Sequence, residues 1–428
     1  MKKVLASALV TVMSVSMLAG CGGDAPVAQE STPAAVESQT GQSPTEVTDV
    51  ALKVWVPQNQ VDCGIIEQQQ KAFAAEHPEW NITWTTEIVG EDNAKTTILN
   101  DVEAAADVFF YASDQVVELV ETGAIARLGG STEAMVKETI AESVVATAMV
   151  GDGLYGIPFT HNTFYMYYDK TLMTEDDVKT MEGILAKETA DNVYNFYFES
   201  AGGWKLGAWY YGAGLEVFGP QGNDLAAGVN WNNETGVAVT NYLIDLINNP
   251  KVAYDGEISV SELIADHRLG VWFDGSWNDQ NWKDILGDDL GIGVIPTYNL
   301  NGKDTQLLGF YGSKCIGVNA SSKYMQAAVA FAAFLGNEEN QILRYELSGQ
   351  IPANMNAGNS AAVLADPLAT VIVNEANTAS VAQPASSVFG TRYWTYANTI
   401  PTEIRSKALN KDNVKEKLDT FVSQMTAE

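Results

Sequence analysis

A regular alternation of strand-like and helix-like segments in the first third of the chain constrains its fold most. Residues 51–57 form an apolar, β-branched run, and the segment after it carries apolar residues at helical spacing until Pro78. A second strand pattern (81–89), a helical segment (93–105) and a buried strand pattern (106–112) follow. Such alternation predicts an α/β fold in which helices cover both faces of a parallel sheet.

A longer extended segment lies between further strands and helices in the rest of the chain. Residues 153–173 are rich in aromatic side chains and have a proline near their start, so this segment can leave one sheet and enter another. The other expected elements are a helix capped by Ser113 and ended by Gly123, a helical region at 192–211, a strand, turn and helix at 271–282, a short strand that ends at Pro296, and a strand and helix at 315–335.

The chain is strongly acidic, with 54 Asp and Glu against 24 Lys and Arg among 428 residues and a net charge of −30. This length suggests two or three compact units. A surface of this kind repels phosphate groups and anionic lipids, which argues against a nucleic-acid partner. The acidity also suits a cationic ligand such as a polyamine, and that alternative stays open.

Cysteine and histidine are rare in this chain. The three cysteines form no C-x-x-C motif, and we expect Cys63 and Cys315 to be free rather than paired. None of the three histidines lies at metal-ligand spacing from a second histidine or a cysteine. We therefore expect neither a metal nor a cofactor.

The N-terminus has the features of a secretory signal. Two lysines precede an apolar stretch over residues 4–18, and the ending Leu-Ala-Gly-Cys resembles the signal of bacterial lipoproteins, in which the cysteine thiol is acylated. We expect residues 1–20 to be the signal, Cys21 the lipid anchor, and residues 21–49 a flexible spacer, because its polar stretch holds no aromatic residue. This places the protein on the outer face of the bacterial cytoplasmic membrane.

The order of segments in the body resembles the extracellular solute-binding proteins of ABC importers, in particular the maltose/maltodextrin-binding branch. The resemblance is carried by ADVFFYASDQVVELVETGAIARL (106–128), YGIPFTHNTFYMYYDKTLM (155–173), FDGSWNDQNW (273–282) and a segment from GVNASSKYMQAAVAFAAFL to LSGQIPA (317–353). Each motif is loose, and their order and spacing make the match specific. The resemblance implies a monomeric receptor that captures an oligosaccharide and passes it to the permease subunits of an importer.

The resemblance also implies a two-lobe fold of the periplasmic-binding-protein type. Each lobe would be a sheet flanked by helices, with the ligand cleft between the lobes and two or three chain crossovers joining them. The implied boundaries are an N-terminal lobe at 50–160 and 308–366, a C-terminal lobe at 165–305 and 367–428, and a hinge at 161–164 and 306–307. Closure about this hinge would accompany ligand binding.

A sugar site needs aromatic platforms for the apolar C–H face and polar groups for the hydroxyl rim. Tyr111 and Asp114 lie at the end of a buried strand, where the family places an aromatic residue and a sugar-binding Asp. Gln115 follows, where maltose-type relatives carry Arg. The alternative is that Tyr111 is a core residue and that Asp114 or Ser113 only caps a helix.

Three further aromatic residues match stacking positions of the family. Trp277 follows a strand and a glycine, and Trp394 is the second matching tryptophan. Tyr197 matches a third position, and Trp204 is a rival candidate for it because the two glycines before it allow flexibility. Core packing is the alternative for each of them.

Polar residues near the predicted cleft complete the expected site. Gln58 and Asn59 follow the first strand, in a loop that faces the cleft in such folds, where the family uses Asp and Lys. Asn162 lies at the hinge, where relatives place Glu. His161 beside it is expected to be structural. These amides favour a neutral, hydroxylated ligand.

Two other functions compete with a sugar receptor. An enzyme finds little support, because no G-x-S-x-G, H-E-x-x-H, phosphate-loop or dinucleotide motif is present, and we expect no catalytic activity. The pairs Tyr167–Tyr168 and Tyr210–Tyr211 raise the alternative of ferric iron binding. The function predicted is capture of malto-oligosaccharides, with another oligosaccharide (β-linked or galacto-type) or a polyamine as the alternative ligand.

Overall fold

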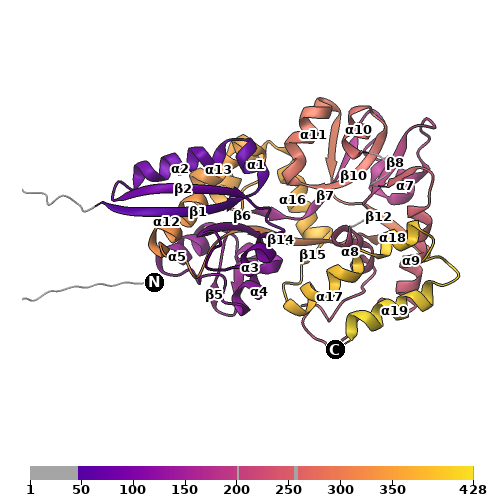
Figure 1. Ribbon diagram of the computed structural model, residues 1–428. Helices are drawn as coiled ribbons and strands as arrows, with labels where there is room; N and C mark the ends of the chain where they lie inside the picture. The colour runs from indigo at the N-terminus through magenta and orange to yellow at the C-terminus, as the bar shows by residue number, and fades with distance from the viewer. Residues whose placement is uncertain (1–46, 200–201, 255–258, 428) are drawn as a thin grey trace, which may run out of the picture. The chain divides into compact units, whose positions relative to one another are not determined.

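The computed structural model describes residues 47–199, 202–254 and 259–427 (Figure 1). The predicted signal, the lipid-anchor Cys21 and nearly all of the predicted spacer therefore lie outside the described residues. Among the residues described, no helix combines the length and apolar character that crossing a membrane requires.

One mixed sheet of six strands forms the first half of the body. Its order is β15-β14-β3-β1-β2, and β6 also pairs with β14. The strands are β1 (Thr48–Val56), β2 (Trp80–Ile88), β3 (Val108–Ala112), β6 (Ile157–Asn162), β14 (Gly309–Val318) and β15 (Ser380–Ala382). The prediction of a parallel sheet is correct for β1, β2 and β3 but wrong for β14, which runs antiparallel to β3 and β6. The reason is that β14 enters from the second sheet rather than through a helical crossover.

The second sheet has five strands in the order β11-β7-β10-β8-β9. They are β7 (Phe164–Asp169), β8 (Tyr194–Phe198), β9 (Val252–Tyr254), β10 (Leu269–Gly275) and β11 (Leu290–Gly293). Only Thr163 separates β6 in the first sheet from β7 in the second, so the aromatic-rich extended segment passes between sheets as predicted. The chain returns to the first sheet at β14, later packs α16 (Pro367–Thr378) against the second sheet, and then pairs β15 with β14 in the first sheet.

The helices lie around these sheets (Figure 1). Those up to the middle of the chain are α1 (Gln58–Asp62), α2 (Ile65–Glu76), α3 (Ala94–Asn100), α4 (Val116–Glu121), α5 (Gly130–Thr139), α6 (Glu142–Val145), α7 (Met181–Ala186), α8 (Gly203–Gly212), α9 (Glu234–Ile247) and α10 (Val260–Ala265). Those that follow are α11 (Asp279–Leu286), α12 (Met325–Leu335), α13 (Glu338–Ser348), α14 (Met355–Gly358), α15 (Ala361–Leu364), α16 (Pro367–Thr378), α17 (Ser387–Ala397), α18 (Ile400–Arg405) and α19 (Val414–Thr426). Two small hairpins, β4 (Met149–Val150) with β5 (Gly153–Leu154) and β12 (Thr297–Leu300) with β13 (Lys303–Gln306), complete the fold.

Two local predictions are corrected by the structure. The region 192–211 is not one helix, because residues 194–198 form β8, which is paired on both sides by β9 and β10. Its aromatic residues suit a buried strand, and the helix begins only at Gly203, with Gly202 as its N-cap. Ser113 does not cap a helix, because its Oγ accepts a hydrogen bond from the backbone N–H of Ser313 at 3.0 Å.

The buried apolar residues form separate cores. One core surrounds the first sheet and includes residues of α2 and α12, and a second joins the other sheet to α8, α9, α17 and α19. A third, smaller core joins the opposite face of the second sheet to residues of α10, α11 and α16. Two sheets with separate cores give the two-lobe α/β architecture, while the lobe and hinge boundaries stay predictions. Cys63 and Cys315 are free.

A candidate ligand-binding cleft

The carboxyl ends of the three parallel strands in the first sheet place polar residues side by side. Gln58 and Asn59 begin α1 directly after β1, Glu91 and Asp92 follow β2, and Asp114 follows β3. Strand ends of this kind form the usual ligand crevice of an open α/β sheet.

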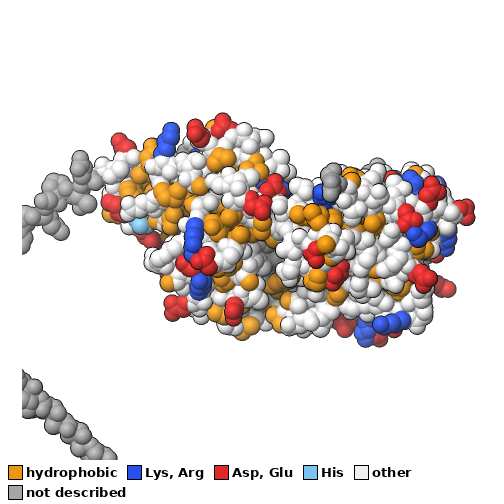
Figure 2. Space-filling model, turned by 90° about the horizontal axis from the view of Figure 1, so that it is seen from below, with side chains coloured by type: hydrophobic (Ala, Val, Ile, Leu, Met, Phe, Trp, Pro, Cys, Tyr) orange, Lys and Arg blue, Asp and Glu red, His pale blue; other side chains and the backbone are white. Residues whose placement is uncertain are grey.

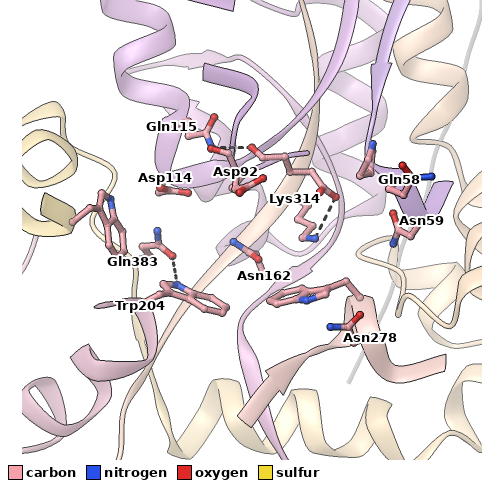
Figure 3. A pocket seen from close by; sticks show the side chains of 15 residues that line it. Gln58, Asn59, Asp92, Asp114, Gln115, Asn162, Trp204, Asn278, Lys314 and Gln383 are labelled. Carbon is pink, nitrogen blue, oxygen red and sulfur yellow. Dashed lines mark hydrogen bonds and ion pairs between the residues drawn. The ribbon is translucent and has the colours of Figure 1, made fainter. Parts of the chain in front are cut away.

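A cavity of about 670 Å³ opens at these strand ends, within the range of small-molecule sites (Figure 3). Its opposite wall comes from the second lobe and carries three tryptophans. The lining residues are Pro57, Gln58, Asn59, Glu91, Asp92, Ala112, Asp114, Gln115, Asn162, Trp204, Trp277, Asn278, Lys314, Gln383 and Trp394. Seven of the nine predicted site residues are therefore brought together in one cleft. Their contact with a ligand stays a prediction.

Tyr111 is a correction to the predicted site. Its side chain is fully buried in the core of the first lobe, and its hydroxyl donates to the carbonyl oxygen of Tyr155 at 3.3 Å. Burial raises the pKa of Tyr111 well above its ordinary value. Every residue of β3 is buried because the strand is internal to the sheet and helices α3 and α12 pack against it, so the core interpretation of Tyr111 is the correct one.

Tyr197 is the second correction. It lies beside a small separate hollow together with Lys205 and Trp209 and does not line the cleft. Trp204, the rival candidate, lines the cleft instead. Its Nε1 donates to Oε1 of Gln383 at 3.0 Å, and its ring centroid is 5.8 Å from that of Trp277.

Gln115 lines the cleft but has most of its hydrogen-bonding capacity engaged. Its Nε2 donates to the carbonyl oxygens of Glu91 and Asp92 at 2.8 and 3.0 Å, and its Oε1 accepts from the backbone N–H of Lys95 at 2.9 Å. Its contribution is therefore to fix the loop between β2 and α3. That loop carries the two carboxylates at positions 91 and 92 into the cleft.

Asp114 is an unusual carboxylate. Burial raises its pKa to about 6, and the neighbouring charge of Asp92 acts in the same direction. The charge of Lys95 and a hydrogen bond from Gln383 partly oppose this rise. Asp114 is thus ionised at neutral pH but poorly solvated, so a ligand hydroxyl that donates to it would restore lost hydrogen bonding.

The turn between β10 and α11 presents Trp277 and Asn278. Asp274 holds this turn, because its carboxylate accepts from the backbone N–H of Gly275 at 2.8 Å, from Nδ2 of Asn278 at 2.9 Å and from Nε1 of Trp282 at 3.0 Å. The Trp277 ring lies across Gly275, where a Cβ would collide with three of its ring atoms. The Gly-x-Trp spacing is therefore a steric requirement of this arrangement.

Sequence reasoning missed five polar cleft residues, namely Glu91, Asp92, Asn278, Lys314 and Gln383. The first two follow β2 as Gln58 follows β1, so the rule of strand ends could have found them. Lys314 and Gln383 had no local signal, because their positions depend on the pairing of β14 with β3, β6 and β15.

The remaining polar candidates belong to the protein interior. Burial lowers the pKa of His161 to about 4, and its Nδ1 lies 2.6 Å from the hydroxyl of Tyr311, which fits the expected structural role. Tyr167 and Tyr210 are fully buried, so the ferric iron alternative gains nothing from them. In the described part of the chain, no cluster of three or more metal-ligating side chains occurs.

Two α/β lobes with an aromatic and polar cleft at their strand ends define the class of two-lobe binding proteins. The model of the family described as bacterial extracellular solute-binding protein matches residues 68–371. The chain therefore belongs to that family, as its resemblance indicated.

Three relatives show the range of this similarity. A galactooligosaccharide-binding protein of Bacillus subtilis is 25% identical over 75% of this chain and 77% of its own. A maltooligosaccharide ABC transporter solute-binding lipoprotein of Streptococcus pneumoniae is 28% identical over 66% of this chain and 67% of its own. A protein solved with acarbose is 35% identical, with a TM-score of 0.82, and the match covers 88% of this chain and 98% of that chain.

Proposed function

We propose that the cleft binds a malto-oligosaccharide and that the protein delivers it to the permease of an ABC importer. The observation that carries this proposal is the meeting of three tryptophan rings with carboxylates and amides in one cavity. Aromatic faces stack on the apolar side of a sugar ring, and the polar groups exchange hydrogen bonds with its hydroxyls. The relatives named above as binding maltooligosaccharide and as solved with acarbose support the choice of ligand.

The two sheets supply different parts of the proposed site. Gln58 and Asp114 come from the strand ends of the first sheet, whereas Trp204 and Trp277 come from α8 and the end of β10. A ligand that contacts both groups binds the closed arrangement more tightly than an open one. Its differential affinity then shifts the population toward closure about the predicted hinge at 161–164 and 306–307.

The proposal also covers the assembly state, the activity and the location of the protein. The protein acts as a monomeric receptor without catalytic activity, held at the outer face of the cytoplasmic membrane by a lipid on Cys21. Acidic side chains are spread over the face in Figure 2 without a continuous basic patch, which fits a neutral ligand rather than a nucleic acid.

Calorimetric titration of a soluble form starting at Glu46, the first residue of the compact unit, tests the proposal. We expect micromolar binding of maltotetraose and little response to a β-galacto-oligosaccharide or to spermidine. The galacto-type ligand is the second candidate because of the Bacillus subtilis relative. Heat released only with the β-galacto-oligosaccharide would show that the receptor is specific for that sugar and not for malto-oligosaccharides. Heat released only with spermidine would contradict a sugar receptor.

Replacing the tryptophans locates the site. We expect Trp277→Ala and Trp394→Ala each to weaken maltotetraose binding by about tenfold or more, because stacking area is lost. Trp80→Ala is the matched control, since Trp80 lies in β2 and does not line the cleft. Unchanged affinity in both cleft variants, with their unfolding curves intact, would show that the ligand binds elsewhere.

A further inference from the structure

Lys314 is an unexpected residue in the wall of an oligosaccharide cleft. Among the described lining residues it is the only cation, and it is 7% exposed. Its Nζ lies 3.2 Å from Oε1 of Glu91 and 4.6 Å from the centroid of the Trp277 ring. It therefore connects a strand of the first sheet with the aromatic wall of the second lobe.

The Trp277 ring has only one face available to a ligand. Its other face lies against the backbone of Gly275, where not even a Cβ would fit. The Lys314 ammonium stands over the ring and cannot share the side that Gly275 fills, so it covers the free face. A sugar ring in van der Waals contact with the indole would need the same space, because carbon atoms in contact lie about 3.5–4 Å apart.

We propose that Lys314 is an internal competitor for the Trp277 face, which a saccharide must displace before it can stack there. This inference rests on the proposed function. The ammonium is held in place by Glu91, whose loop is fixed by Gln115. A partly desolvated cation over an indole ring is a favourable contact. A ligand that breaks this contact therefore binds less tightly than it would bind to the same cleft without Lys314.

After displacement, Lys314 remains near Glu91 and offers N–H donors to ligand hydroxyls. These hydrogen bonds restore only part of the free energy of the lost contact with the Trp277 ring. The ion pair with Glu91 is present with and without ligand, so it does not offset this loss. Lys314 therefore lowers the affinity of every ligand that stacks on Trp277.

The test is a titration of maltotetraose into Lys314→Gln, whose shorter neutral side chain can still donate to Glu91. We expect the affinity to rise by about 3- to 10-fold, which corresponds to the range of a cation–π contact. In a Trp277→Ala background the same substitution should change the affinity by less than about twofold. Lys53→Gln is a matched control, because Lys53 pairs with Glu87 at 3.1 Å and lies 5.9 Å from the Trp55 ring, outside the cleft.

A ligand-free measurement completes the test. Urea unfolding of the two single variants and the double variant should give non-additive stability changes, because Lys314 and Trp277 are in contact. Additive changes, or weaker or unaltered maltotetraose binding by Lys314→Gln, would overturn the inference while the receptor function stands. Absence of maltotetraose binding by the unmodified protein would overturn both.

Discussion

At the scale of single residues, Trp277 can lie along the cleft only because residue 275 has no side chain. The ring occupies the position of a Cβ at residue 275, and the hydrogen bonds of Asp274 fix the turn. Asp114, which lines the same cleft from the first sheet, is held where its charge is poorly solvated. Both features cost stability or restrict the sequence without improving the core, which is typical of binding sites.

Gly275→Ala tests the steric part of this account. The added methyl group must push the Trp277 ring away, so we expect maltotetraose affinity to fall by about tenfold, close to the effect of Trp277→Ala. Gly129→Ala is the control, since no atom lies within 4 Å of the Cβ it would add. A Gly275→Ala protein that binds as tightly as the unmodified one would contradict the requirement for glycine.

Asp114→Asn tests the electrostatic part. The folded pKa of about 6 lies above the ordinary value, so stability associated with the protonated carboxyl is lost as the pH rises through about 6. Without ligand, the variant should therefore be more stable than the unmodified protein at pH 8, on the order of 1–2 kcal/mol. The difference should vanish below about pH 4, where the carboxyl is protonated in both states.

Urea unfolding at several pH values measures this difference, and titration with maltotetraose at pH 8 provides the second readout. We expect weaker binding by the variant at that pH, because a neutral amide accepts less strongly from hydroxyls than a carboxylate. The raised pKa of Asp114 would be contradicted if the difference in free energy of unfolding between the variant and the unmodified protein were the same at pH 4 and at pH 8.

At the scale of elements, local patterns predicted the strands that are flanked by their own helices. β1, β2 and β3 were found because each is an apolar or alternating run beside a helical segment. β8 was missed, since its aromatic run before two glycines was assigned to the following helix. The direction of β14 and the position of Lys314 could not be predicted, because they depend on pairing with segments about 150 to 200 residues away.

The candidate site follows the same division. Residues directly after a strand or in a turn, such as Asp114 and Trp277, were predicted to face the cleft and do line it. Tyr111 is at a strand end too, but alternation along a fully buried strand does not show which side chains face a cleft. Resemblance to the family did not show whether Tyr197 or Trp204 lines the cleft. The packing of α8 decides this, because it places Trp204 in the cleft wall.

The β10–α11 turn provides a prediction at this scale. Asp274→Ala leaves three partly buried donors without their acceptor, so we expect a loss of about 2 kcal/mol in the free energy of unfolding. Maltotetraose affinity should also fall, because Trp277 and Asn278 lose their fixed positions. Asp284→Ala is the control, since this exposed carboxylate on α11 accepts only from the side chain of Gln280 in the described structure. Unchanged affinity in a folded Asp274→Ala protein would show that the turn does not depend on this carboxylate.

At the scale of the whole molecule, the account requires both lobes to contribute to one ligand site. The strands change sheet between β6 and β7 and again between β11 and β14, and we propose that the lobes move relative to each other about these connections. A ligand held by Asp114 on one side and by tryptophan rings on the other connects binding with closure. We propose that this coupling allows an importer to distinguish the loaded receptor from the empty one.

The most direct test is a crystal structure of the body with maltotetraose. We expect sugar rings stacked on tryptophans of the cleft, hydroxyls hydrogen-bonded to Asp114 and the amides of the first sheet, and the Lys314 ammonium moved off Trp277. A sugar bound outside this cavity, or held by one lobe alone with the tryptophan faces empty, would contradict the central claim.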